Sequence, residues 1–109
     1  MSVTIKLKNP EQLMEAIQDG IKQKKIKLWE IDDEGHLTHT PNKYYKKAWF
    51  SGEVNKITGE VTFKYIKPKN SKENKSLYGM YHGRFIKMIL SNFYKKFELE
   101  STEFKQADR

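Results

Sequence analysis

Alternating apolar and polar positions predict most of the secondary structure of this chain. Residues 3–8 place Val3, Ile5 and Leu7 on one side and polar side chains on the other, as expected for a strand with one buried face. Further segments with this two-residue period predict strands over 26–31, 36–40, 44–55 and 60–67. In the hairpin of the last two, the predicted core side chains are Ala48, Phe50, Val54, Val61, Phe63 and Tyr65.

Turn and cap residues divide these strands from two helices. Gly35 and Gly59 each follow polar residues and accept positive φ angles, which favours tight turns there. Asn9 and Pro10 suit the cap and the first residue of a helix that an apolar stripe continues to about residue 23. A longer helix is predicted over 77–97, with Ser76 as its expected cap.

These elements predict an α+β fold in one domain over residues 1–97, in the order β-α-β-β-β-β-α. A mainly antiparallel sheet is expected to pack against a short N-terminal helix and a long C-terminal helix, both on one face or at one end. The polar tail, residues 98–109, is expected to fray or to extend the second helix.

The composition excludes several classes of protein. Without cysteine there is no disulfide, no thiolate nucleophile and no zinc–thiolate site. The chain has no run of eighteen apolar residues that would span a membrane, and its first residues lack the apolar core of a signal peptide. These features favour a cytoplasmic protein without a membrane partner, and no motif indicates a cofactor.

Positive charge is concentrated in the middle of the chain. Residues 36–97 carry thirteen Lys and Arg against three Glu, whereas both flanking parts are slightly acidic. Such an excess favours an anionic partner such as nucleic acid. Only Arg84 and Arg109 are arginine, the residue better suited to bidentate contacts with phosphates. The charge therefore fits either an anion-binding surface or simple solubility, and the sequence leaves both open.

Lysines interleaved with aromatic residues lead to the first hypothesis, a non-catalytic module that binds nucleic acid. Bases stack on exposed aromatic rings while ammonium groups meet phosphates. The stacking face on the predicted hairpin would consist of Tyr45, Lys47, Trp49 and Lys64. A flexible basic clamp in the loop after the hairpin would consist of Lys67, Lys69, Lys72 and Lys75. In the alternative interpretation, Trp49 lies buried beneath the second helix.

The aromatic second helix leads to a second hypothesis, a protein-interaction or homodimerisation module of the inhibitor or immunity type. Apolar residues extend almost around this helix, which is wider than packing on one sheet requires. The stripe that would face a partner consists of Tyr81, Phe85, Ile89 and Phe93. The alternative is an ordinary core helix.

Residues with catalytic or metal-binding chemistry are few. His36 and His39 are three apart on a predicted strand, so they face opposite sides and no metal site is expected. The chain contains no nucleophile elbow, phosphate-binding loop or dinucleotide fingerprint. A remote alternative is a small nuclease with His82 as its base. The phosphate ligands in that alternative are Tyr81, Arg84 or Lys87. The sequence thus favours a binding module over an enzyme.

Overall fold

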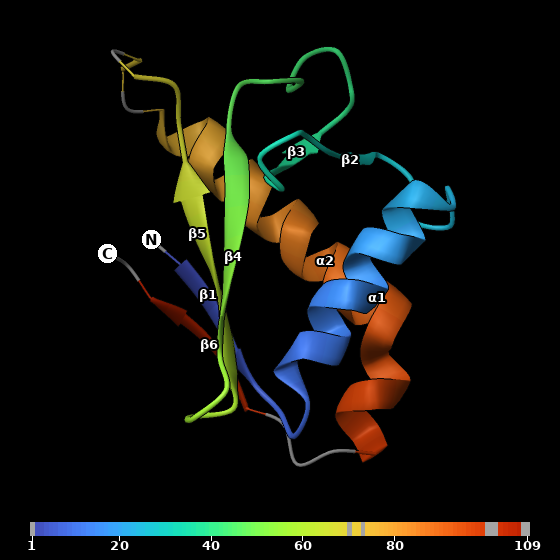
Figure 1. Cartoon of the computed structure of the whole chain (residues 1–109). Coiled ribbons are helices and arrows are strands. Elements are labelled where there is room, and N and C mark those ends of the chain that lie inside the picture. Colours follow the sequence, from blue (N-terminus) through green and yellow to red (C-terminus); the bar gives the residue numbers. More distant parts are fainter. Residues whose placement is uncertain (1, 70, 73, 100–102, 108–109) are drawn as a thin grey trace.

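The computed structural model describes residues 2–69, 71–72, 74–99 and 103–107. Within these residues the chain forms six strands and two helices (Figure 1). The elements are β1 (Ser2–Lys6), α1 (Pro10–Lys22), β2 (Trp29–Ile31), β3 (Leu37–His39), β4 (Trp49–Asn55), β5 (Glu60–Ile66), α2 (Lys75–Leu99) and β6 (Glu103–Ala107). The α+β class and the predicted order of elements through α2 are confirmed, and β6 is an addition.

All strands join one antiparallel sheet in the order β2-β3-β4-β5-β1-β6. The longest pairing is the β4–β5 hairpin, which runs from Trp49↔Ile66 to Asn55↔Glu60. Its turn contains Gly59 at φ 72°, a left-handed conformation that glycine adopts without steric cost. The expected turn glycine between β2 and β3, Gly35, likewise has φ 81°. The alternation and the turn signals therefore identified both hairpins.

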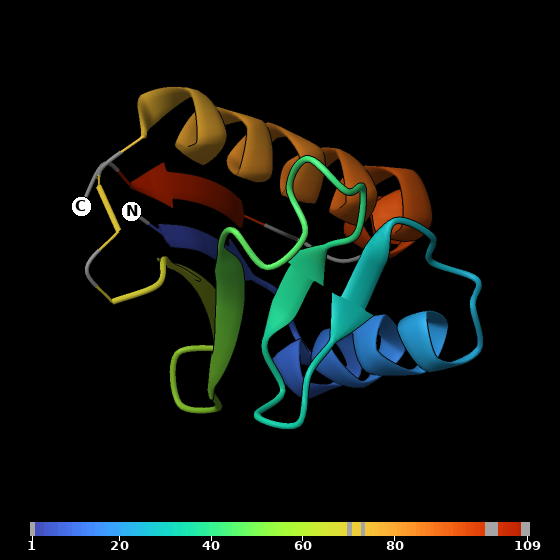
Figure 2. The ribbon, with the colours of Figure 1, turned by 90° about the horizontal axis from the view of Figure 1, so that it is seen from above.

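Both helices cover the same face of the sheet, as predicted. Figure 2 shows the strands curving around α2, with α1 at the β2 end of the sheet. Phe85 of α2 is fully buried, and its ring stacks on Phe50 of β4 with centroids 4.4 Å apart. Met14 of α1 lies so close to Gly52 that a Cβ there would come within 2.8 Å of it. The tip of the Met14 side chain therefore fills the space above Gly52, where α1 packs on β4.

The opposite face of the sheet, here called the outer face, carries mainly polar side chains. Strand alternation places these residues on it: Thr4, Lys6, Trp49, Ser51, Glu53, Thr62, Lys64 and Ile66. Lys64 and Glu53 are exposed, and the hydroxyl oxygens of Thr4 and Thr62 lie 3.1 Å apart in a hydrogen bond. This polarity is typical of a sheet that is solvated on one side.

Two strands are shorter than the alternation predicts. The segment predicted over 26–31 becomes a strand only at Trp29, because Leu28 takes φ 71°, which breaks extended backbone. The segment predicted over 44–55 starts as β4 only at Trp49, and residues 41–47 form successive turns. Within these turns, Lys46 has φ 57°. The predicted alternation of faces across residues 44–48 is therefore wrong.

The start of α2 and the tail after it also differ from expectation. Asn74, rather than Ser76, caps α2, since its Oδ1 accepts a hydrogen bond from the Leu77 amide at 3.0 Å. Among the described residues of the tail, 98 and 99 continue α2, whereas residues 103–107 form β6 and pair with β1 along its full length. Strand pairing with a distant partner has no local signal in a polar segment.

Candidate anion-binding pocket

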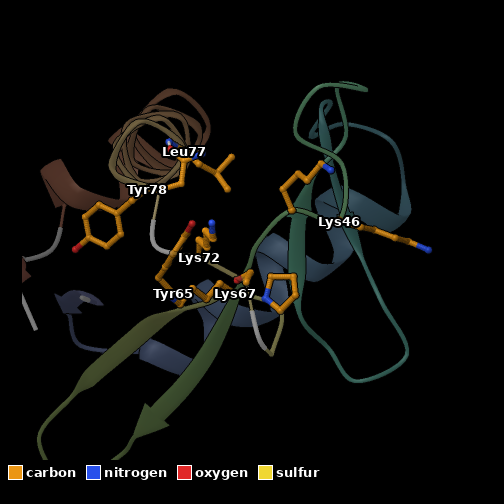
Figure 3. Close-up of a pocket in the computed structure, with 10 residues that line it drawn as sticks. Lys46, Tyr65, Lys67, Lys72, Leu77 and Tyr78 are labelled. Atoms are coloured by element: carbon orange, nitrogen blue, oxygen red, sulfur yellow. Dashed lines mark hydrogen bonds between the residues drawn. The ribbon is translucent and has the colours of Figure 1, made fainter.

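A pocket of about 620 Å³ opens where the end of β5 and the first turn of α2 meet the turns over 41–47 (Figure 3). We call it the lysine pocket, and its walls are Lys46, Lys47, Tyr65, Lys67, Pro68, Ser71, Lys72, Asn74, Leu77 and Tyr78. None of these described lining residues is acidic. The lysines come from two segments about twenty residues apart, so the fold itself brings their charges together.

Two tyrosines form an aromatic wall of the lysine pocket. Tyr65 points from β5 toward α2, and its ring lies 5.1 Å from that of Tyr78 in an edge-on arrangement (Figure 3). His82 lies beneath them, with its ring 4.2 Å from Tyr78 and its Nδ1 2.8 Å from the Tyr78 carbonyl oxygen. Burial, reinforced by Tyr81, raises the pKa of Tyr65. Its phenol therefore stays protonated at neutral pH and is able to donate a hydrogen bond into the pocket.

A buried polar network holds the turns over 41–47 against α2. The Tyr81 hydroxyl, on α2, donates a hydrogen bond to the Tyr44 carbonyl. Thr38 of β3 donates to the Ala48 carbonyl at 2.9 Å and accepts from the Lys46 amide at 3.2 Å. Because Tyr81 and Thr38 are almost completely buried, these bonds are shielded from water. The network fixes the wall of the pocket that carries Lys46 and Lys47.

Lys46 combines a strained backbone with a tethered side chain. Its left-handed conformation costs a non-glycine residue about 1–2 kcal/mol. Its ammonium nitrogen lies 5.3 Å from the centre of the Tyr45 ring, a cation–π contact. Tyr45 in turn donates a hydrogen bond of 2.6 Å to Glu30, and this bond raises the pKa of the phenol. Strain of this kind clusters at functional sites, where the surrounding structure maintains it.

The structure divides the eight residues predicted to bind nucleic acid among different surfaces. Lys47, Lys67 and Lys72 line the lysine pocket. Lys69, on the same loop as Lys67, and Lys75, the first residue of α2, are exposed and do not line the pocket. Tyr45 is on the turns and bonded to Glu30. The remaining two, Trp49 and Lys64, lie on the outer face. The predicted stacking face is therefore not formed.

On the outer face, the lysine charge is matched by acid. Lys64 Nζ lies 3.4 Å from Glu53 Oε2, on the neighbouring strand. Trp49 is half-buried beside its cross-strand partner Ile66. It does not lie beneath α2, because both helices pack on the other face of β4, so the alternative interpretation of Trp49 is also wrong. The outer face thus lacks the excess positive charge of the pocket.

Seven of the ten lining residues were not among the predicted site residues, and the three with an aromatic ring or a charge are Lys46, Tyr65 and Tyr78. Alternation assigned Tyr65 to the core, and it is half-buried at the core's end, where its ring also reaches the pocket. Lys46 was assigned to the core side of a strand that does not exist there. Tyr78 was treated as part of the width of the aromatic helix. One signal was available: Tyr65 and Tyr78 flank the lysine-rich segment 67–76 on both sides.

The residues proposed as a protein interface are in the core instead. Tyr81, Phe85 and Ile89 are 0% exposed and belong to the hydrophobic core of the chain. Phe93 is half-buried against the same core and has non-helical φ and ψ angles of −130° and 15°. This interface prediction is wrong, because the curved sheet wraps around α2 and covers more of it than a flat sheet would.

His82, the base in the nuclease alternative, is also buried in the core. His82 is 2% exposed, and Phe50 and Tyr65 pack against its ring with centroids 5.1 Å and 5.2 Å away. Tyr81 is buried as well, so only Arg84 and Lys87 of that set are exposed. Among the described residues, no group of three or more His, Asp or Glu side chains is placed to hold a metal ion. No helix in the described part of the chain is long and apolar enough to cross a membrane.

Comparison with models of protein families, with curated proteins and with solved structures finds no match to this chain. The functional argument therefore rests on the geometry and the charge of the lysine pocket.

Proposed function

We propose that this protein binds single-stranded nucleic acid through the lysine pocket. The observation that carries the proposal is the convergence of Lys47, Lys67 and Lys72, from two distant segments, around Tyr65 and Tyr78, without an acidic partner among the described lining residues. Lys47, Lys67 and Lys72 would neutralise phosphates, and the tyrosines would receive a base. Lys69 and Lys75, which are exposed beside the pocket, would extend the contact along the backbone.

The shape of the pocket favours an unpaired strand over a duplex. A volume of about 620 Å³ lies within the range of small-molecule sites, about 300–1,000 Å³, and is sufficient for one nucleotide. The tyrosine rings line a concave wall, which a base reaches only when it leaves its own stack. The outer face would suit a duplex no better, because Lys64 is already paired with Glu53.

The test compares two triple variants with the same net charge. Lys47→Glu, Lys67→Glu and Lys72→Glu change the pocket, while Lys8→Glu, Lys25→Glu and Lys27→Glu change exposed lysines elsewhere. Each set of three reversals takes the formal net charge from +7 to +1. A labelled adenine octamer reports binding by fluorescence anisotropy. An external label is needed because Trp29 is buried in the core and Trp49 lies on the outer face.

We expect the pocket variant to bind the octamer about 100-fold more weakly than the wild type, and the control variant to stay within about threefold. Binding to the wild type should weaken steeply as salt rises, and a hairpin duplex should bind less well than the single strand. Equal losses in the two variants would contradict the proposal, since they would show that only net charge matters. A folded wild type that does not bind at physiological salt would also contradict it.

A further inference from the structure

A second pocket adjoins the lysine pocket on the other side of Leu77. It has a volume of about 540 Å³ and is lined by Lys43, Tyr44, Lys47, Asn74, Ser76, Leu77 and Met80. We call it the Met80 pocket. Its floor is apolar, and its described cations are Lys43 and Lys47. No acidic residue is among its described walls.

The two pockets share Lys47, Asn74 and Leu77, so they adjoin, and we call the pair the track. Helix geometry explains why the two pockets lie on different sides of Leu77, because successive residues on α2 point about 100° apart. Relative to Leu77, Tyr78 projects toward one side and Met80 toward the other. Leu77 is therefore the ridge between the two pockets, and Lys47 faces this ridge from the turns over 41–47.

We infer that the track binds two consecutive unpaired nucleotides, one in each pocket, with the phosphate that links them at the shared residue Lys47. This inference rests on the proposed function and specifies the unit of ligand that the site recognises. The lysine pocket presents Tyr65 and Tyr78 to the first base. The Met80 pocket presents Leu77, Met80 and the half-buried Tyr44 to the second base.

The lining favours nucleotides over an acidic peptide. Each pocket places an apolar or aromatic wall directly beside ammonium groups, and a nucleotide combines a flat apolar ring with a phosphate in the same way. The carboxylates of an acidic peptide would meet the lysines but leave both walls facing water. An acidic peptide is therefore the competing ligand in the test below.

The test is an NMR titration of the full chain with three adenosine ligands. AMP carries one base and one phosphate, ADP one base and two phosphates, and the 5′-phosphorylated dinucleotide pApA two bases and two phosphates. We expect pApA to bind about tenfold more tightly than ADP, because only pApA fills both pockets. The amide signals of Ser76 and Met80 should shift with pApA and change little with AMP.

Two serine variants separate the pockets. Ser71→Glu adds a carboxylate to the lysine pocket only, and Ser76→Glu adds the same group to the Met80 pocket only. Both serines are exposed, and a carboxylate at residue 76 also suits the first turn of α2, so both variants should fold. Ser71→Glu should weaken the binding of AMP and the binding of pApA by similar factors. Ser76→Glu should lower the ratio of pApA affinity to AMP affinity several-fold.

The outcomes distinguish this inference from the proposed function. If the octamer binds but pApA binds no more tightly than ADP, or if Ser76→Glu leaves the affinity ratio unchanged, the two-nucleotide site is wrong and the function stands. If the octamer does not bind at all, both are wrong. A glutamate octapeptide that binds as tightly as the adenine octamer, with the same shifted signals, would overturn both in favour of a charge-only site.

Discussion

The lysine pocket and the outer face contain the same kinds of residue and differ in how the fold pairs their charges. Lys64 and Trp49 on the outer face resemble Lys67 and Tyr65 at the pocket in composition. Antiparallel register, however, places Glu53 within 3.4 Å of Lys64, on the neighbouring strand of the same hairpin. At the pocket, the strand has ended and the nearest segments bring further lysines. A basic aromatic composition therefore indicates a site only where no cross-strand acid neutralises it.

The two regions also differ in what supports them, and Tyr81→Phe tests this difference with the largest expected effect on stability. Loss of the hydroxyl removes its hydrogen bond to the Tyr44 carbonyl, which keeps only the Lys47 amide as a donor, and removes the acceptor of the His39 amide. These losses should lower the free energy of unfolding by about 1–3 kcal/mol in urea titrations. Affinity for the adenine octamer should fall as well, since the turns that carry Lys47 lose their anchor on α2.

Thr62→Val is the matched control on the outer face. It removes one hydroxyl from the partly buried Thr4–Thr62 hydrogen bond, and we expect a loss below about 1 kcal/mol with unchanged octamer affinity. Similar destabilisation by the two variants would show that the network around Tyr81 is no more important than a surface hydrogen bond.

A pair of single lysine variants examines the charge difference directly. Lys67→Gln should weaken octamer binding up to about tenfold and reduce the slope of log affinity against log salt by about 0.7, the value for one contact with a single strand. Lys64→Gln should change affinity less than about twofold, because Glu53 already neutralises that lysine. Anisotropy titrations at three salt concentrations measure both quantities. The reverse ranking would move the binding site to the outer face.

The third and smallest expected effect concerns pH and the buried His39 behind the pocket. His39 is 1% exposed, and neither ring nitrogen makes a well-formed hydrogen bond. Burial lowers its pKa below 6.5; the backbone of Leu28 partly opposes this shift, and the charge of Arg84 adds to it. The rings packed around it belong to Trp29, Tyr44 and Tyr81.

Because the pKa of His39 is lower in the folded chain, a fall in pH protonates His39 in the unfolded chain before it does so in the folded chain. The contribution of neutral His39 to stability is therefore complete above pH 6.5 and decreases as pH falls below it. For one proton, the slope of the free energy of unfolding against pH cannot exceed about 1.4 kcal/mol per pH unit. Urea unfolding between pH 7.5 and 5 should show this decrease in the wild type and in His36→Gln, and a weaker one in His39→Leu. The same slope in His39→Leu would assign the effect elsewhere.

Local patterns were sufficient for most of the fold. Two-residue alternation identified the β4–β5 hairpin and its core residues Phe50 and Phe63, because side chains on a strand must point to opposite faces. The apolar stripe and Pro10 identified α1, whose observed end at Lys22 lies one residue from the expected one. Both turn glycines were identified because few other residues tolerate positive φ.

The candidate site was only partly predictable. Lys47, Lys67 and Lys72 were assigned to nucleic-acid binding, although as members of two separate surfaces. Their convergence depends on the turns over 41–47, which alternation described as a strand. Backbone bonds from Tyr44 and Tyr45 to the Pro41 carbonyl close those turns, and Tyr81, about forty residues later, holds them against α2 through its bond to the Tyr44 carbonyl. A pattern confined to one segment contains no information about such a distant partner.

The sequence by itself determined the α+β class, the hairpins, the two helices and the basic character of the middle of the chain, since each follows from local periodicity or composition. Only the tertiary structure decided which lysines are matched by acid, which aromatic rings remain accessible and where the last strand pairs. These properties depend on contacts between residues far apart in the chain, because register and sheet curvature place each side chain against its neighbours.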